Sequence, residues 1–209
     1  MGSYLLSILL PPQKNWEILM GTIQNITDNV KDINNVEIIL KISESEVEDY
    51  LPKISDLLNL TPHIKILIID SRREDTSSLH SINNQTLIAD GEFLLLLNNG
   101  ILFNTPDLDS MVQKYHGKLC IIEGKNNLSI TSPFIVHHKI VEILGLQPLF
   151  NSICSEFGIE IKEPNISYTC EESKLRDNNF KGGESLNLKK LKSYIDTLEW
   201  SKDWLPLVI

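Results

Sequence analysis

Two adjacent amides, Asn98 and Asn99, directly follow the apolar run Phe93 to Leu97. Such a run predicts a buried strand, and ligands bind at the carboxyl ends of strands in open α/β sheets. The two amides therefore stand where this kind of fold places ligand-binding groups. Amide oxygens can coordinate Mg²⁺ or Mn²⁺, but they bring no negative charge, so they predict weak metal binding at most. Followed by Gly100, the same two residues also fit a tight turn without any ligand.

Positive charge near this predicted edge comes from Arg72 and Arg73, which follow the apolar run Ile64 to Ile69. Beside a phosphate they would neutralise its charge, whereas beside Glu74 and Asp75 they would form a solvated loop of mixed charge. Both alternatives are open.

A second candidate group is the histidine pair His137 and His138, which lies in a segment with a predicted helix. Adjacent helical residues point about 100° apart, so at most one of the two can face a site. A packed or surface position is the alternative for each.

Several carboxylates are candidates for general acid–base chemistry or for binding hydroxyl and N–H donors. Glu44 would accept hydrogen bonds from a base or ribose, or would stabilise the first turn of the helix that follows it. Asp109 would act as a base on the acceptor side, or would simply belong to the first turns of its helix. Asp177 falls in a loop-like stretch around Gly182-Gly183. The candidates for a catalytic base are Asp109, Glu123 and Asp177.

The elements that position these residues follow from hydrophobic periodicity. Apolar runs at 4–10, 36–42, 64–69 and 93–97 predict strands, and helical patterns start at Asn15 and cover 50–58 and 77–89. Successive strand–helix units predict an α/β fold, with a mostly parallel sheet and helices on both faces. Beyond Asn99 we expect a strand at 101–103, then a helix with Thr105 as its cap, Pro106 at its first position and Asp107 in its first turn. A strand at 118–123, a helix opened by Ser132-Pro133-Phe134 that runs to Leu144, and a strand at 165–170 should follow.

Composition narrows the class of protein. The chain has 209 residues, 42% of them hydrophobic, which suits one domain with a sizeable core. Its net charge of −9 argues against binding to nucleic acid, which needs clustered Lys and Arg. Its 3 cysteines lack paired spacing and indicate free thiols in a reducing compartment. No apolar run is long enough to span a bilayer. The apolar segment at 204–209 either packs onto the domain or leads into a further C-terminal domain.

The order of these features resembles the nucleotide-diphospho-sugar glycosyltransferases of the GT-A fold, near family 2. The first strand runs into Leu9-Leu10-Pro11-Pro12-Gln13-Lys14-Asn15, and the second ends in the acidic turn Ser43-Glu44. The approach Ala89-Asp90-Gly91-Glu92-Phe93 and the segment Ile101 to Asp109 resemble the flanks of the family's Asp-x-Asp metal motif. Pro133-Phe134-Ile135-Val136 with Leu144-Gly145 resembles its acceptor-side helix. The resemblance covers roughly residues 4–180.

The resemblance implies a single GT-A (Rossmann-like) domain over 1–209. Residues 1–100 would bind the nucleotide sugar, 101–180 the acceptor, and 181–209 would form a helical appendage. It implies transfer of a sugar to a hydroxyl of a glycan or other acceptor, with inversion, in the cytoplasm of a bacterial cell or of a virus-infected host. Acceptor-side positions would be His137 and His138, and donor-binding positions Pro11, Gln13, Glu44, Arg72, Arg73, Asn98 and Asn99.

The chain departs from the family at positions where the family has metal-binding or catalytic side chains. Asn98 and Asn99 replace the carboxylates of the metal motif, no histidine occurs near Tyr168 to Cys170, and no Glu-Asp pair follows the strand at 118–123. With weak or no metal dependence, protein cations would have to neutralise the leaving diphosphate. The alternatives are a catalytically inactive relative that binds a sugar, nucleotide or protein, and a different nucleotide-binding α/β domain. No Gly-rich phosphate loop supports the last.

Overall fold

The computed structural model describes residues 4–11, 13, 15–61, 63–69, 84–97, 101–123, 134–144, 159–162, 164 and 166–170. Its strands are β1 (Tyr4–Leu10), β2 (Val36–Ser43), β3 (Ile64–Ile69), β4 (Gly91–Leu96), β5 (Ile101–Phe103), β6 (Cys120–Glu123), β7 (Phe134–His137), β8 (Glu160–Lys162) and β9 (Tyr168–Cys170). Its helices are α1 (Trp16–Asp28), α2 (Val47–Tyr50), α3 (Ile54–Leu60), α5 (Leu108–Gln113) and α6 (His138–Leu144), with short 3-10 helices at Ile33–Asn35, Glu44–Glu46 and Leu51–Lys53.

The main sheet has seven strands in the order β3-β2-β1-β4-β7-β6-β8. Strands β1 to β4 are mutually parallel, and β6 and β8 are parallel to each other. Only β7 runs against its neighbours β4 and β6. The structure thus confirms the predicted α/β fold with a mixed, mostly parallel sheet. A separate pair, β5 with β9, is antiparallel.

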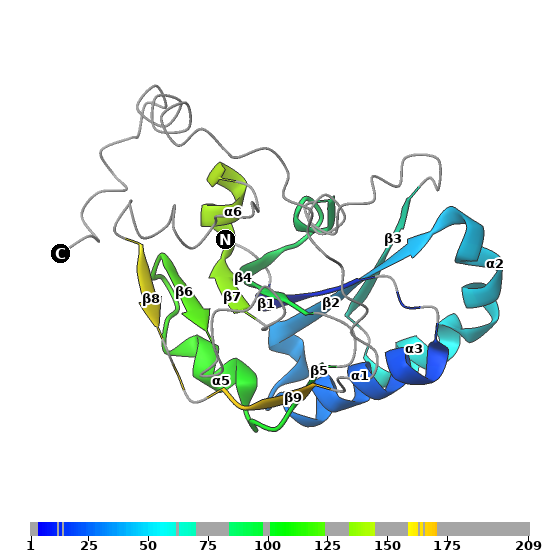
Figure 1. The fold of residues 1–209 in the computed structure, drawn as a ribbon, viewed down its shortest axis with the longest axis horizontal. Coiled ribbons are helices and arrows are strands. Elements are labelled where there is room, and N and C mark those ends of the chain that lie inside the picture. The colour runs from blue at the N-terminus through cyan, green and yellow to red at the C-terminus, as the bar shows by residue number, and fades with distance from the viewer. Residues whose placement is uncertain are drawn as a thin grey trace.

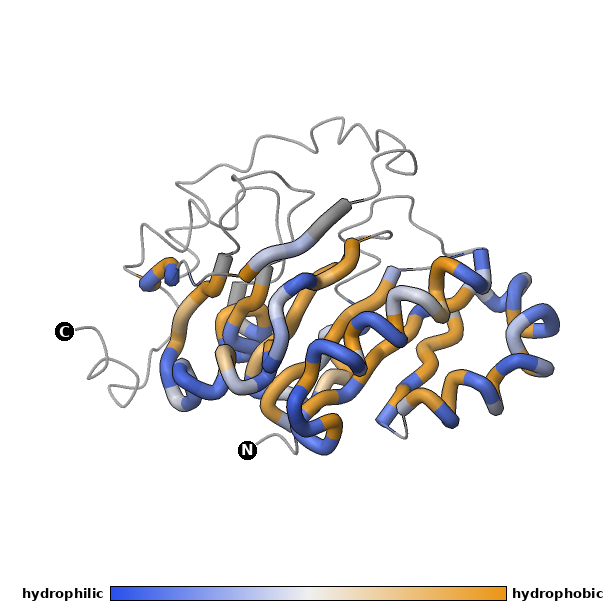
Figure 2. The backbone as a smooth tube through the Cα atoms, turned by 90° about the horizontal axis from the view of Figure 1, so that it is seen from below, coloured by the Kyte–Doolittle hydropathy of each residue, from blue (hydrophilic) through white to orange (hydrophobic). Residues whose placement is uncertain are grey.

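Helices cover both faces of the main sheet (Figure 1), as predicted. Helices α1, α3 and α5 pack on one face, and α6 with the helical turn 84–86 lies on the other. The strands are hydrophobic along most of their length, whereas hydrophobic and hydrophilic residues alternate along the helices (Figure 2). This difference is expected, because a strand between two helical layers buries both of its faces. No helix among the described residues is both long and apolar enough to cross a membrane.

Helix α1 forms as its sequence predicts. The side-chain oxygen of Asn15 accepts hydrogen bonds from the backbone N–H of Glu17 (3.0 Å) and Ile18 (3.3 Å), so it caps the first turn. Leu19, Ile23 and Ile26 recur at helical spacing and are all buried against the sheet. Burial of each such side chain contributes about 1.5–3 kcal/mol.

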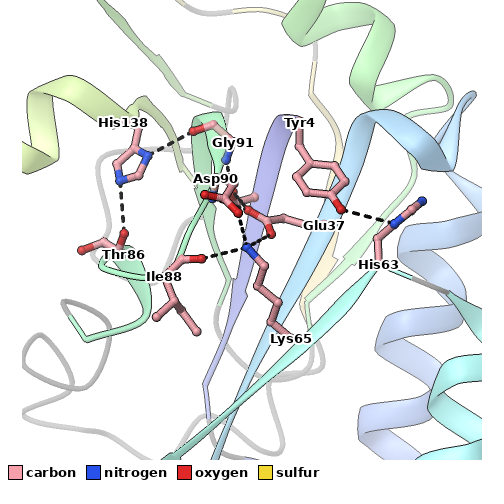
Figure 3. A network of polar contacts seen from close by, with 10 residues as sticks. Tyr4, Glu37, His63, Lys65, Thr86, Ile88, Asp90, Gly91 and His138 are labelled. Carbon is pink, nitrogen blue, oxygen red and sulfur yellow. Dashed lines mark hydrogen bonds and ion pairs between the residues drawn. The ribbon is translucent and has the colours of Figure 1, made fainter. Parts of the chain in front are cut away.

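A partly buried polar network connects the amino-terminal ends of the strands (Figure 3). Ser7 Oγ donates to Glu37 Oε1 over 2.5 Å and accepts from Gly91 N over 2.8 Å. Lys65 Nζ pairs with Glu37 Oε2 at 2.7 Å and with Asp90 Oδ2 at 2.6 Å. Burial lowers the Lys65 pKa, but the hydrogen bonds to Asp90 and Glu37 outweigh it and leave the pKa raised. The network joins four neighbouring strands at the edge opposite their carboxyl ends.

Two local predictions are wrong. The helix expected over 134–144 begins only at His138, because Phe134–His137 forms β7 between β4 and β6. Its Phe-Ile-Val start favours a strand, and the sheet offers it two partners. The expected cap at Thr105 is also wrong. Asp107, with φ of 56°, precedes α5, while the Thr105 hydroxyl donates to Ser167 O and accepts from Ser167 N.

Candidate functional site

The carboxyl ends of six strands meet at one edge of the sheet, which we call the carboxyl rim. Strands β1, β2, β3 and β4 are parallel. Strand β6 also runs with β4, because both are antiparallel to β7 between them. Strand β8 is parallel to β6. The rim is therefore bounded by Leu10, Ser43, Ile69, Leu96, Glu123 and Lys162 and by the residues that follow each. This is the edge where open α/β sheets bind ligands.

Glu123 lies in line with the end of β4. Leu96 pairs with Phe134 of β7, and Phe134 pairs with Glu123 of β6. Neighbouring strands lie about 4.8 Å apart, so the backbones of Leu96 and Glu123 are separated by roughly 10 Å across the rim. Asn98 follows Leu96 closely in the chain. Of the two predicted base candidates among the described residues, Asp109 and Glu123, the one that ends a strand at this rim is Glu123.

The end of β1 supplies Pro11 and Gln13, both partly exposed, as the expected donor-binding edge requires. The side-chain oxygen of Gln13 accepts from Asn15 N over 3.0 Å. The Gln13 carbonyl accepts a hydrogen bond from the hydroxyl of Tyr50. This contact holds the segment after β1 against helix α2, and so connects the ends of β1 and β2.

The end of β2 supplies Glu44, which is exposed at the start of a 3-10 turn. Glu46 closes this turn, because its carboxylate accepts from Ser43 N over 3.4 Å. Glu44 is thus free of that capping role and lies on the solvent side of the rim. Its expected contact with a base or ribose remains a prediction.

A hollow of about 240 Å³ lies beside these residues, between the first turn of α1 and helix α2. It is lined by Trp16, Glu46, Asp49, Tyr50 and Lys53. The rings of Trp16 and Tyr50 meet edge to face with centroids 5.7 Å apart, and Lys53 Nζ lies 5.3 Å from the centroid of the Trp16 ring. Burial, followed by the charges of Glu46 and Asp49, raises the pKa of the Tyr50 phenol. Tyr50 is therefore a neutral donor at ordinary pH.

Sequence reasoning did not single out this hollow. The predicted helices that start at Asn15 and cover 50–58 contain Trp16 and Tyr50, and both residues pack against the core. The sequence feature that could have indicated the hollow is the position of these two residues, since each comes soon after the end of a parallel strand. Aromatic residues at that edge are exposed to a ligand on one side and to the core on the other.

Five predicted site residues lie outside the described residues: Arg72, Arg73, Asn98, Asn99 and Asp177. Arg72 and Arg73 follow β3 in the chain, and Asn98 and Asn99 follow β4. Their roles stay predictions. The two arginines and the two asparagines thus follow, in the sequence, two strands that end at the carboxyl rim.

Asp109 lies at the opposite edge. Its carboxylate is buried and accepts hydrogen bonds from the backbone N–H of Lys31 (2.8 Å) and Asp32 (3.2 Å). These residues connect the end of α1 to the start of β2, at the amino-terminal edge of the sheet. A carboxylate held there by two backbone donors orders a loop, and this location does not support the expected role as a base at the rim.

His137 and His138 also lie at the amino-terminal edge. His137 pairs with Phe93, near the start of β4, and its Nε2 lies 3.7 Å from Glu92 Oε1. Burial lowers the His137 pKa, with Glu92 partly opposing the shift. His138 places its two ring nitrogens 3.1 Å from the carbonyls of Gly91 and Thr86 (Figure 3). Neither position supports the expected acceptor-side role.

The residues at the rim do not fit a tight divalent metal site. Among the described residues, no group of three or more His, Cys, Asp or Glu side chains could hold a metal ion. The chain has the amides Asn98 and Asn99 where the resemblance implies metal-binding carboxylates. Hard cations in proteins are held mainly by anionic oxygens, so this donor set is a poor one for Mg²⁺ or Mn²⁺.

Comparison with known proteins gives structural similarity alone. No family pattern and no curated protein matches the sequence. The mannosyltransferase PcManGT from Pyrobaculum calidifontis, solved with GDP-Man and Mn²⁺, superposes with a TM-score of 0.61 at 12% identity over 76% of this chain and 54% of its own. S. aureus TarS 1–349 with UDP-GlcNAc gives 0.51 at 10% identity, over 66% of this chain and 46% of its own.

HddC from Yersinia pseudotuberculosis gives a TM-score of 0.52 at 11% identity, over 79% of this chain and 93% of its own. The chain therefore spans about half the length of the first two structures and nearly all of the third. Similarity at these identities establishes a glycosyltransferase-like α/β fold.

Proposed function

We propose that this chain binds a nucleotide-diphospho-sugar at the carboxyl rim and transfers the sugar to a hydroxyl acceptor with inversion. Two similar structures were solved with such donors, GDP-Man and UDP-GlcNAc. The observation that carries the proposal is the register that aligns Glu123 with the end of β4. This register supports the choice of Glu123, because its backbone ends a strand at the rim over which we propose the donor binds. The whole of 1–209 acts as one domain, and its site of action is the cytoplasm.

In this mechanism the acceptor oxygen attacks the anomeric carbon while the bond from that carbon to the diphosphate breaks. The acceptor proton passes to the Glu123 carboxylate, which acts as general base. Glu123 is preferred to Asp109, which is held at the opposite edge, and to Asp177, which lies outside the described residues.

Charge on the departing nucleoside diphosphate must be neutralised by the protein. Arg72 and Arg73, which follow β3, supply two guanidinium groups suited to phosphate oxygens. Asn98 and Asn99 contribute neutral hydrogen-bond donors, and we expect donor binding to depend weakly or not at all on Mn²⁺. Pro11, Gln13 and Glu44 then form the nucleoside side of the site.

The test measures donor binding and turnover separately. Calorimetry with guanosine and uridine diphospho-sugars, with and without Mn²⁺, gives the affinity. Release of nucleoside diphosphate with water as acceptor gives turnover without knowledge of the natural acceptor. We expect Glu123→Gln to reduce turnover by about 10²- to 10⁴-fold with donor affinity unchanged. The control is Glu142→Gln, an exposed residue of α6 that pairs with Lys139 and should leave both measurements unchanged.

An inactive relative that binds a nucleotide sugar without turnover is the second candidate. The replacement of the metal-binding carboxylates by Asn98 and Asn99 favours it. Tight donor binding with no release of nucleoside diphosphate from the unmodified chain would select this candidate. Failure of every nucleotide sugar to bind would refute both.

A further inference from the structure

The hollow at the carboxyl rim is the right size for one part of a donor. Sites for drug-sized ligands occupy about 300–1,000 Å³. A hollow of about 240 Å³ therefore suits a single aromatic ring system rather than a complete nucleotide sugar. It opens beside the segment after β1 and the turn after β2, where the proposed function places the nucleoside.

The walls of the hollow combine aromatic rings with carboxylates. Trp16 is half-buried and Tyr50 is buried, so their positions are fixed by the core beneath them. The bond from the Tyr50 hydroxyl to the Gln13 carbonyl further fixes the walls before any ligand arrives. Glu46 and Asp49 supply oxygens that only accept hydrogen bonds when ionised.

The one ammonium group among the lining residues is already engaged, because Lys53 lies over the Trp16 ring. The charges of Glu46, Asp49 and Lys53 leave the hollow with an excess of negative charge. A phosphate would be repelled there, whereas a neutral planar group rich in N–H donors would be attracted.

We infer that this hollow receives the nucleobase of the donor and selects guanine over uracil, an inference that rests on the proposed function. Guanine presents two adjacent donors, its ring N1–H and its amino group, and together they match the two oxygens of one carboxylate. Uracil presents one N–H between two carbonyl oxygens, which a carboxylate repels. Adenine presents its amino group beside a ring nitrogen that is itself an acceptor. Only guanine satisfies a carboxylate with two parallel hydrogen bonds.

The size of the preference follows from such paired contacts. A good bidentate contact to a base discriminates against a wrong base by roughly 5- to 150-fold. We therefore expect GDP to bind at least several times more tightly than UDP or ADP. Since all three carry the same ribose and diphosphate, any difference between them reports the base alone.

The experiment is calorimetric titration of the full chain with GDP, UDP and ADP, followed by the same titrations of Asp49→Asn and Glu46→Gln. Neither variant should disturb folding. Asn is close to isosteric with Asp, and the amide introduced by Glu46→Gln keeps an oxygen that can accept from Ser43 N. At least one of the two should lose most of the GDP preference while its UDP affinity changes little. Glu48→Gln is the matched control, since Glu48 belongs to the same helix and does not line the hollow.

The outcomes separate this inference from the function on which it rests. If UDP binds as tightly as GDP, or if neither carboxylate variant alters the preference, guanine selection by the hollow is refuted and the proposed function stands. If no nucleoside diphosphate and no nucleotide sugar binds, both are refuted.

Discussion

Glu37 and Lys65 form an ion pair of 2.7 Å between Oε2 and Nζ that joins β2 to β3, although Glu37 is fully buried. The other oxygen of Glu37 accepts from the Ser7 hydroxyl at 2.5 Å and from Asp90 N at 2.6 Å. A buried carboxylate is tolerated only when it is paired and hydrogen-bonded in this way. The pair therefore fixes how four strands meet at the edge opposite the candidate site.

Glu37→Ala should destabilise the fold strongly. It leaves the Ser7 hydroxyl and the Asp90 N–H without their acceptor, and it removes a counter-charge from Lys65. A buried hydrogen-bonding group left without its partner costs about 1–3 kcal/mol, and Lys65, which is 33% exposed, keeps its pair with Asp90. The measurement is the free energy of unfolding in urea, with Glu142→Ala as control. Glu142 pairs with Lys139 at the surface, so its loss should cost under about 1 kcal/mol. Equal losses of unfolding free energy in Glu37→Ala and Glu142→Ala would contradict a stabilising role for Glu37.

Gly91→Ala should also destabilise the fold, through steric crowding. A Cβ at Gly91 would lie 2.5 Å from Ser7 N and 2.9 Å from the Leu6 carbonyl carbon, both of them rigid backbone atoms. Crowding of this kind costs about 1–3 kcal/mol. Gly21→Ala is the matched control, because Gly21 lies within α1 with no atom near its added Cβ. That substitution should stabilise the fold by about 0.5–1 kcal/mol. A neutral Gly91→Ala in the same thermal or urea unfolding series would refute the close approach of β4 to β1.

The sequence predicted most of the sheet because its signals there are local. Continuous Ile and Leu runs mark β1 to β4, and Asn15 marks the start of α1. The segment Phe134–His137 was misassigned because a short apolar run carries no periodicity that separates strand from helix. The segment forms a strand because it pairs with both β4 and β6, and these two partners are in place only once the sheet has formed.

The candidate site was less predictable, because its residues meet through long-range contacts. The partners of Asp109, at Lys31 and Asp32, lie 78 and 77 positions away in the chain. The alignment of Glu123 with Leu96 likewise depends on β7, a strand that was expected to be helical. Residue type suggested the chemistry of each carboxylate, but only the register of the sheet indicated which edge it occupies.

Stability should fall as the pH falls through the titration of His137. Burial lowers the pKa of this side chain in the folded state, so the unfolded chain takes up its proton first. The stabilising effect of the neutral ring is complete above the unfolded pKa of about 6.5 and is lost as the pH drops below that value toward the folded pKa. Unfolding free energies at several pH values between about 7.5 and about 5.5 test this. His137→Gln should show a shallower decline over the same range, and an unchanged slope would contradict it.

Asp109→Asn should lower stability and leave chemistry intact. An amide presents one acceptor oxygen to the backbone N–H groups of Lys31 and Asp32, and its amino group would face the second of them. An unsatisfied buried donor costs about 1–3 kcal/mol. At a temperature where circular dichroism shows both proteins folded, release of nucleoside diphosphate should therefore proceed at the unmodified rate. Glu123→Gln, assayed beside it, should show the reverse pattern of normal stability with little turnover. A large fall in turnover for Asp109→Asn, with its unfolding free energy unchanged, would transfer the role of base to Asp109 and move the site to the other edge of the sheet.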